Sequence, residues 1–390
     1  MGSVSRPPYL FAVAVFCLLT CVAVYAREIW TPTAANDWYA KQPWIVGANY
    51  IPASAVNQLE MWQAETFDPA RVDRELGWAE SVGMNTMRVF LHDLPWQQDP
   101  VGFRKRIDQF LGICSKHHIR VLFVLFDSVW EPEPKAGPQN PPIPGIHNSR
   151  WVQSPGLTAL HDSAQEGRLS TYVAGVVGEF AKDERIIGWD VWNEPSNARE
   201  HVERVRVLLP KVFGWARSAN PIQPLTSAVF KDTGWTEGKP SPIDEIQLKE
   251  SDVISFHDYH WPEVFEGKVA RLEKLDRPVW CTEYLARGTG STFDGSLPLG
   301  KRHHVAMINW GLVDGRTQTR LPWDSWDIPY VNGREPAVWH HDVFRADGTP
   351  YRQAEVDLIR ANSAASGAAV PQHGLGQLWD SAVVTLRDIK

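Results

Sequence analysis

Two glutamates stand where two buried strands are expected to end. One segment covers residues 188–195 and has the sequence GWDVWNEP, in which Glu194 follows an apolar run and Pro195 prevents the strand from continuing. The other covers residues 278–284, PVWCTEY, and is again apolar until Glu283. Cleavage of a glycosidic bond needs such a pair, one carboxyl group to protonate the leaving oxygen and one to attack or stabilise the sugar. Two unrelated surface glutamates are the alternative, but the repeated pattern favours catalysis.

The strands and helices that must position these glutamates are predicted to alternate regularly along the chain. Apolar runs predict eight strands, at residues 44–49, 85–91, 120–126, 186–192, 224–230, 253–257, 278–282 and 308–313. Capping signals and helical spacing predict helices between them, at residues 68–83, 101–118, 169–182, 198–218 and 301–307. Eight strands alternating with helices predict an α/β fold, a closed parallel (β/α)8 TIM barrel in a single domain. An open doubly wound sheet would need a glycine-rich first turn, which residues 47–50 (GANY) do not provide.

Polar side chains gather at one end of this predicted barrel. The carboxyl ends of the strands form the working face of such barrels. The polar residues predicted at those ends are Asn49, Arg88, His92, Asp127, Asn193, Glu194, His257, Tyr259 and Glu283. The loop after the third strand, residues 127–169, carries six prolines between Pro132 and Pro144. Its length and stiffness predict an ordered flap over the substrate.

The two ends of the chain differ from this central domain. Residues 1–26 combine Arg6, an apolar stretch and a small-residue site at Ala26, which predicts a signal peptide and a secreted or periplasmic protein. An uncleaved N-terminal membrane anchor is the alternative, because the apolar run is only slightly short of a membrane span. The catalytic domain is expected at residues 27–362, and residues 363–390 form a small, polar, loosely ordered tail.

The amino-acid composition argues against some classes of partner and cofactor. A net charge of −7 and the lack of a basic run argue against nucleic acid. Outside the signal segment only Cys114 and Cys281 remain, and both are expected as buried free thiols. The histidine pairs are adjacent in sequence and lack metal-ligand spacing, so neither a metal nor an organic cofactor is expected.

Tryptophan is unusually frequent, with 19 in the chain. Large aromatic side chains in loops either stack on sugar rings or pack as lids on the domain, and the sequence leaves both roles open. The tryptophans predicted in loops are Trp62, Trp96, Trp130, Trp151, Trp235, Trp261, Trp323 and Trp326.

These motifs resemble the clan A retaining glycoside hydrolases, most closely the family 5 cellulase and mannanase group. The resemblance rests on local motifs at the fourth, sixth, seventh and eighth strands and on the second strand's arginine: Asn193-Glu194-Pro195, His257-Asp258-Tyr259, Glu283, Asn309-Trp310-Gly311-Leu312 and Arg88. It implies that Glu194 is the acid/base and Glu283 the nucleophile. The family's histidine on the third strand is not evident here, and Phe126-Asp127-Ser128 stands at that place.

The resemblance also implies roles for the surrounding residues. Asn193 would bind the sugar 2-hydroxyl, and Trp310 would form the floor under the sugar at the cleavage point. Arg88 and Tyr259 would lower the pKa of Glu283, and anionic Glu283 would raise the pKa of Glu194. His257 would orient Glu194 or bind substrate. Packing inside the barrel is the alternative for Arg88, His257 and Trp310.

The sequence thus predicts a monomeric enzyme that hydrolyses β-glycosidic bonds of a polysaccharide or oligosaccharide by double displacement, in the manner of an endo-β-1,4-glycanase. An exo-acting β-glycosidase on the same barrel is one alternative, and a catalytically silent glycan-binding protein is another. Glucan, mannan and xylan all remain open as substrates. No membrane contact is expected beyond the signal segment.

Overall fold

The computed structural model describes residue 2, residues 26–231 and residues 234–364 of the 390-residue chain. Eight parallel strands make one sheet, in the order β5-β4-β3-β2-β1-β8-β7-β6. Their bounds are β1 Val46–Asn49, β2 Thr86–Phe90, β3 Arg120–Val124, β4 Ile186–Asp190, β5 Leu225–Thr226, β6 Ile254–His257, β7 Val279–Glu283 and β8 Ala306–Asn309. The predicted (β/α)8 barrel is confirmed.

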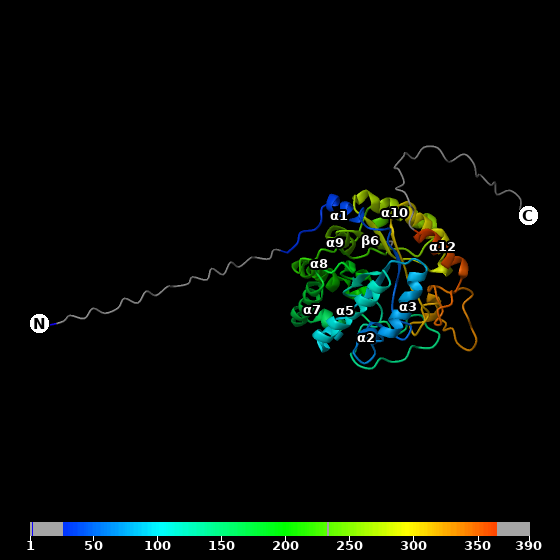
Figure 1. Cartoon of the computed structure of the whole chain (residues 1–390), viewed down its shortest axis with the longest axis horizontal. Helices are drawn as coiled ribbons and strands as arrows, with labels where there is room; N and C mark the ends of the chain where they lie inside the picture. Colours follow the sequence, from blue (N-terminus) through cyan, green and yellow to red (C-terminus); the bar gives the residue numbers. More distant parts are fainter. Residues whose placement is uncertain (1, 3–25, 232–233, 365–390) are drawn as a thin grey trace, which may run out of the picture.

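The barrel closes between β5 and β6, the two ends of the strand order. Val229 and Phe256 form a parallel bridge there, and the Val229 amide donates to the Ser255 carbonyl at 3.1 Å. The His257 amide then donates to the Val229 carbonyl at 3.0 Å, so the contact continues to the end of β6. The helices surround these strands, and α3, α5, α7 and α8 can be followed in chain order (Figure 1).

In the part of the chain that the structure describes, twelve α-helices connect and cover the strands. They are α1 Pro32–Tyr39, α2 Gln58–Trp62, α3 Pro69–Ser81, α4 Asp93–Gln98, α5 Pro100–Lys116, α6 Leu157–His161, α7 Glu166–Glu179, α8 Val202–Ser218, α9 Pro242–Glu250, α10 Pro262–Leu272, α11 Phe293–Arg302 and α12 Gln353–Ser363. Asp68 and Asp99 cap α3 and α5, since each side chain accepts a hydrogen bond from a first-turn amide. The described residues contain no helix that is both long and apolar enough to span a membrane.

Three elements differ from the sequence prediction by more than a shift of a few residues at one end. The eighth strand lies at Ala306–Asn309 instead of 308–313, because the chain turns after Asn309 and Gly311 adopts a φ of +79°. The predicted helix at 301–307 is wrong, since α11 ends at Arg302 and β8 begins at Ala306. The fifth strand is only Leu225–Thr226, shorter than the predicted 224–230.

Apolar side chains fill the half of the barrel interior that lies toward the amino ends of the strands. Trp280 of β7 is buried there in a cluster with Leu122, Ile187 and Ile308. Helix α1 covers the amino end of the strands, and its Tyr39 lies in the same cluster with its hydroxyl bonded to the His304 carbonyl at 2.9 Å. The barrel interior is thus apolar on this side, and the two glutamates lie at the opposite, carboxyl end of the strands.

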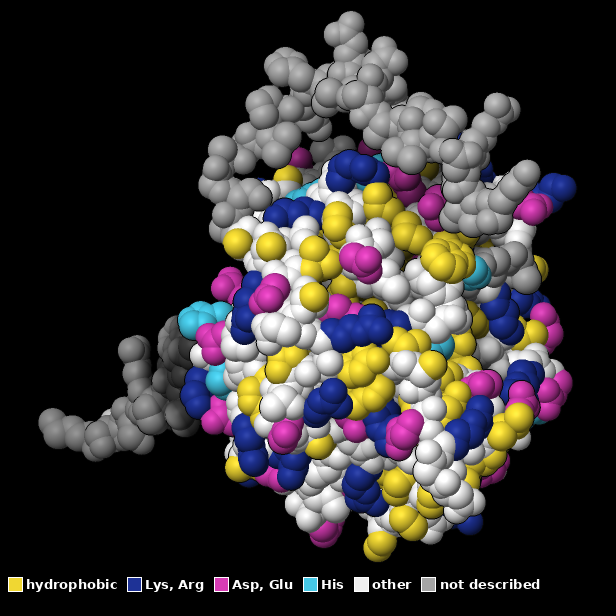
Figure 2. Space-filling view, turned by 90° about the vertical axis from the view of Figure 1, so that its right-hand side faces the viewer, with side chains coloured by type: hydrophobic (Ala, Val, Ile, Leu, Met, Phe, Trp, Pro, Cys, Tyr) yellow, Lys and Arg dark blue, Asp and Glu magenta, His cyan; other side chains and the backbone are white. Residues whose placement is uncertain are grey.

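The predicted signal peptide and tail lie almost wholly outside the described residues. Residues 363 and 364 are described, and Ser363 still belongs to α12. On the face seen in Figure 2, Lys and Arg side chains alternate with Asp and Glu side chains, so neither sign dominates that surface. Cys114 and Cys281 are buried free thiols, as predicted.

Candidate active site

Arg88 of β2 organises the carboxyl end of the barrel. Its Nη1 donates to Glu283 Oε1 at 2.7 Å and to Asn49 Oδ1 at 2.8 Å. Its Nη2 donates to Asp190 Oδ2 and to Asn193 Oδ1, both at 2.7 Å. The side chain is fully buried, and the two carboxylates hold the pKa of the guanidinium above its usual range. Arg88 is thus both the predicted partner of Glu283 and the structural ion-pair partner of Asp190.

Glu283 ends β7 and is held on both oxygens. Arg88 binds Oε1, and the Tyr259 hydroxyl donates to Oε2 at 2.7 Å. Burial raises the pKa of Glu283 above its usual value, while His257, Arg88 and Tyr259 act to lower it. The predicted contacts are therefore present, but the expectation of a lowered pKa is wrong, because burial outweighs them. The charged donors limit a rise that burial alone would make larger.

Glu194 lies just beyond β4, at the start of the short 3-10 segment Pro195–His201. Its backbone is left-handed, with φ 44° and ψ 53°. The Asn197 side chain donates to Oε2 at 2.6 Å, and His257 Nδ1 lies 2.9 Å from Oε1. Burial raises the pKa of Glu194 to about 7. Its predicted elevation is thus found, but burial is the main cause where the charge of Glu283 was expected.

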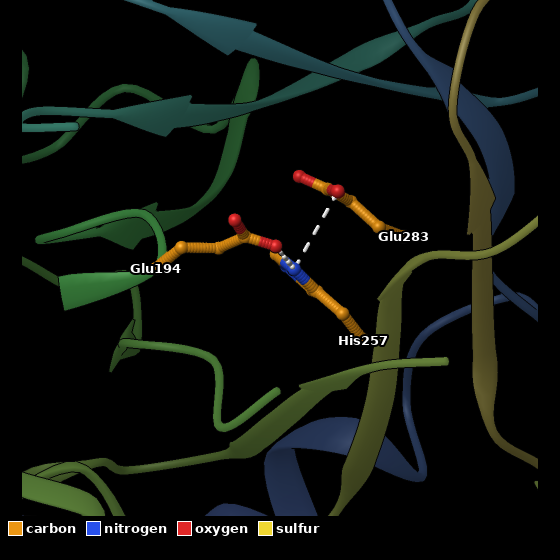
Figure 3. Close-up of side chains that lie close together, drawn as sticks. All are labelled: Glu194, His257 and Glu283. Carbon is orange, nitrogen blue, oxygen red and sulfur yellow. Dashed lines mark hydrogen bonds and ion pairs between the residues drawn. The ribbon is translucent and has the colours of Figure 1, made fainter. Parts of the chain in front are cut away.

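The two glutamates and His257 converge on one point (Figure 3). One ligand atom of each lies within 4.8 Å of the others, and His257 Nδ1 is 3.5 Å from Glu283 Oε2. Burial lowers the pKa of His257 to about 4, so its ring is neutral near pH 7. Such a trio could ligate a divalent cation. However, the Arg88 guanidinium already bonds to Glu283, and its positive charge opposes a second cation at that carboxylate.

Asp127 is a site residue that the sequence placed at a strand end without giving it a role. Its Oδ1 accepts from Asn193 Nδ2 at 2.9 Å, and its Oδ2 accepts from Trp151 Nε1 at 2.7 Å. Gln58 adds a further donor at 3.2 Å. Since Arg88 binds the Asn193 oxygen and Asp127 binds its nitrogen, the amide is fixed in one orientation. Asp127, just beyond β3, is thus used to orient other side chains of the site.

Glu194 and Glu283 line a cavity of about 760 Å³ at the carboxyl end of the barrel. Asn193, Tyr259 and Trp310 of the predicted site line it together with Glu194 and Glu283, whereas His257 and Arg88 lie behind that lining. The indole of Trp310 packs edge-on against Phe90 and Trp151, with ring centroids 5.8 and 5.7 Å apart. All the predicted site residues are thus brought together, in two layers.

The tryptophans predicted in loops lie in three kinds of position: the cavity lining, the core and the exposed surface. Trp130, Trp151, Trp323 and Trp326 line the cavity. Trp62 and Trp235 are buried in the core and Trp96 is nearly so, whereas Trp261 is 65% exposed and lies outside the cavity lining. Residues 128–132, 147–149, 151, 153 and 157 of the predicted flap also line the cavity, together with His341. Neither that histidine nor Phe230, another lining residue, carried a recognisable signal in the sequence.

Comparison with solved structures gives similar barrels at low sequence identity. The exo-β-1,4-mannosidase Op5Man5 from Opitutaceae bacterium strain TAV5 has a TM-score of 0.54 and 19% identity, over 82% of this chain and 59% of that chain. GH5_18 from Streptomyces cattleya, in complex with Manb1-4GlcNAc, has a TM-score of 0.52 and 12% identity, over 83% and 80%. The β-1,4-mannanase of the sea hare Aplysia kurodai has a TM-score of 0.51 and 14% identity, over 69% and 88%.

These likenesses concern the fold. The chain spans less than two thirds of Op5Man5 but most of the other two proteins. No protein-family model matches the sequence, and no curated protein matches it. The barrel predicted from the alternation of strands and helices is therefore matched by the barrels of solved glycoside hydrolases, one of which is labelled GH5_18.

Proposed function

We propose that the protein is a retaining β-glycosidase that uses Glu283 as nucleophile and Glu194 as acid/base. The observation that carries this proposal is the placement of two buried carboxyl groups, with oxygens within 4.8 Å, beside a tryptophan-lined cavity. Retaining enzymes hold their carboxyl groups about 5 to 5.5 Å apart, whereas inverting enzymes need about 6.5 to 9.5 Å to admit a water molecule.

In the first step, a Glu283 oxygen attacks the anomeric carbon and the bond from that carbon to the leaving oxygen breaks. Glu194 gives its proton to that oxygen, for which a pKa of about 7 is suitable near neutral pH. Arg88 and Tyr259 hold the attacking carboxylate in position. Asn193, fixed by Arg88 and Asp127, presents its amide at the cavity wall, where it can meet a sugar hydroxyl.

In the second step, water attacks the glycosyl ester. Once Glu283 is esterified its negative charge is gone, so the pKa of Glu194 falls and Glu194 can take a proton from the water. The sugar leaves with its β configuration, and the Glu283 carboxylate is regenerated. Neutral His257, between the two glutamates, keeps a hydrogen-bond partner beside Glu194 in both steps.

β-Mannosides are the first substrates to test. The similar barrels named above include an exo-β-1,4-mannosidase, a β-1,4-mannanase and a protein crystallised with a Manβ1-4GlcNAc disaccharide. The tryptophans of the cavity suit any sugar with an apolar ring face, so the chemistry of the site leaves glucosides and xylosides as further candidates. We also propose export, through cleavage after Ala26, which the N-terminal sequence of the secreted protein would test.

The test is proton NMR of the first product. The enzyme is incubated with the 4-nitrophenyl β-mannoside, β-glucoside and β-xyloside, and the anomeric signal is recorded before mutarotation. We expect the β anomer from at least one of them. An initial α anomer would make the enzyme inverting and would remove the nucleophile role from Glu283. No turnover of any β-glycoside, with binding to immobilised glycan retained, would make the protein a silent glycan-binding barrel.

A further inference from the structure

One side of the cavity is lined by two long loops that are bonded to each other. We call residues 143–152, which follow β3, and residues 316–330, which follow β8, the end wall. The Asn148 amide donates to the Thr317 carbonyl at 2.7 Å, and the Tyr330 amide donates to the Gly145 carbonyl at 2.9 Å. β3 and β8 are separated by β2 and β1 in the sheet, so these bonds carry the loops across one side of the barrel mouth.

Side chains add further bonds across the end wall. Gln318 accepts from the Gly145 amide at 2.9 Å and donates to the Ile143 and Ile146 carbonyls at 2.8 and 3.1 Å. The His147 amide donates to the Ser325 hydroxyl at 3.0 Å. The end wall is therefore a packed, cross-linked structure, and a substrate chain cannot displace it without breaking several hydrogen bonds.

The end wall is also tied to the loop after β1. The Arg316 amide donates to the Ala53 carbonyl at 3.0 Å, and Asn57 donates to the Arg150 carbonyl at 2.9 Å. Gln58 donates to the Val152 carbonyl at 3.0 Å. Three loops, after β1, β3 and β8, thus close the same side. The cavity residues that the end wall itself supplies are His147, Asn148, Ser149, Trp151, Trp323 and Trp326.

The opposite side of the cavity is built by different elements. It is lined by the 3-10 segment after Glu194, including Asn197 and Arg199, and by Phe230 beyond β5. The leaving group must lie on the side of the proton donor, because Glu194 protonates the oxygen that joins it to the sugar. The sugar that Glu283 attacks then lies on the other side, over Trp310 and against the end wall.

Next to the end wall, His341 also lines the cavity, and it lies against Trp323. His341, which lines the cavity, is fully buried, and its Nδ1 faces the Leu285 carbonyl. Among the described residues its Nε2 has no hydrogen-bond partner. Since Nδ1 must donate to a carbonyl, Nε2 is the acceptor nitrogen of the ring. Trp323 packs 5.7 Å from this ring and 5.1 Å from the Tyr259 ring, next to the nucleophile.

We propose that the end wall makes the cavity a binding site for a single non-reducing terminal sugar, so that the protein removes one sugar at a time from the end of a β-linked chain. This inference rests on the proposed function and takes the place of the internal cleavage expected from the sequence. A cleft open at both ends would let a chain continue past Trp310. Here the bonded loops occupy that path.

The experiment uses the full chain and a hexasaccharide labelled at its reducing end. Hexasaccharides of β-1,4-linked mannose, glucose and xylose are each tested, so that an enzyme that cuts only inside a chain is also detected. We expect free monosaccharide and the labelled pentasaccharide first, then shorter labelled products in order. We also expect at least about a hundredfold slower cleavage when the non-reducing end is blocked by a 4,6-benzylidene group or, for a xylan oligosaccharide, a 4-O-methyl group.

Two glycines of the same flap provide a matched pair of variants. Gly145 has a φ of +76°, and a Cβ there would lie 2.4 Å from the Tyr330 carbonyl oxygen. Gly137 has a similar φ of +97° with nothing within 4 Å of such a Cβ. Gly145→Ala should therefore loosen the end wall and increase cleavage of the blocked hexasaccharide about tenfold or more. Gly137→Ala, equally strained but free of contact, should keep the pattern of the natural chain.

The outcomes separate the two proposals. Labelled di- or trisaccharide among the first products, or rapid cleavage of the blocked substrate by the natural chain, would overturn the inference and leave the glycosidase proposal standing. Failure to cleave any of the β-glycosides would overturn the proposed function, and the inference with it. Equal behaviour of the two glycine variants on the blocked substrate would show that the end wall does not determine the site of cleavage.

Discussion

The two glutamates occupy opposite kinds of environment within one site. Glu283 is bound by a guanidinium and a phenol, and that guanidinium also binds Asp190. Glu194 is bound by an amide and lies beside a histidine that is neutral near pH 7. Burial raises the pKa of both, but only Glu283 has a formal cation in direct contact. The difference shows how two identical side chains can be prepared as anion and acid by their partners.

The largest effect is expected when the carboxylate of Glu283 is removed. Glu283→Ala should lower turnover by about 10⁴-fold or more, because it removes the carboxylate that attacks the anomeric carbon. Added azide should restore cleavage of an activated aryl glycoside, with an α-glycosyl azide as product. Glu263→Ala, at an exposed position on α10, should remain fully active. Turnover within tenfold of the natural chain would remove Glu283 from the mechanism.

Removing the acid should give a selective loss. Glu194→Ala should slow substrates with poor leaving groups about 10³-fold, the range typical of general acid catalysis. A 2,4-dinitrophenyl glycoside needs little protonation, so the first step on it should suffer far less. Rates for a series of aryl leaving groups would show this as a steeper dependence on leaving-group pKa. The same loss on every member of the series would argue against a proton-donor role.

The charged network around Glu283 can be weakened without removing its charge. Arg88→Lys keeps the cation, but a single ammonium cannot bind Glu283, Asp190, Asn49 and Asn193 together. We expect kcat to fall about 10²-fold and the free energy of unfolding to fall by about 1–3 kcal/mol. Denaturant unfolding and steady-state kinetics would measure both. Arg104→Lys, which alters an ion pair at the surface, should change neither appreciably.

The pH profile should report the same contrast. Glu194 must be protonated, so kcat/KM should fall tenfold per pH unit above its pKa of about 7. Glu283 must be ionised, and its raised pKa should move the acid limb above the range of an ordinary glutamate. The two limbs belong to the coupled pair. An enzyme equally active at pH 6 and pH 9 would contradict the assignment of Glu194.

The smallest expected effect is a shift of the basic limb of the pH profile, and it tests whether that limb belongs to Glu194. Asn197 donates to Glu194 at 2.6 Å and so lowers its pKa. Asn197→Ala should move the basic limb upward by roughly half a pH unit to one unit, with the acid limb unchanged. A shift of the acid limb instead would mean that the groups assigned to the two limbs must be exchanged.

The sequence predicted the catalytic pair because the signal was local. Glu194 and Glu283 follow apolar runs that end abruptly, and a barrel brings the ends of its strands together whatever their order in the chain. The ion pair between Arg88 and Asp190 joins residues about a hundred positions apart, and nothing in the local sequence distinguishes Asp190 from the strand around it. The role of Asp127 was missed for the same reason.

The misplaced eighth strand has a physical cause as well. Residues 306–313 form one continuous run of mostly apolar side chains, AMINWGLV, and such a run does not indicate where pairing stops. Asn309 ends it by turning its side chain to the Gly311 carbonyl at 2.7 Å. Helix α11 contains Gly295, Pro298 and Gly300, which disfavour helix, so its packing against the barrel overrides local preference.

The left-handed backbone of Glu194 lowers the free energy of unfolding of the protein, and natural selection must tolerate this loss. A residue with a Cβ loses about 1 kcal/mol or more in that conformation, which glycine adopts freely. A population of variants selected for heat resistance alone should therefore accumulate glycine at position 194 and become inactive. Only selection for turnover would retain glutamate at position 194. Under selection for both heat resistance and turnover, the fraction of variants that keep this glutamate would therefore measure how strongly the host depends on the reaction.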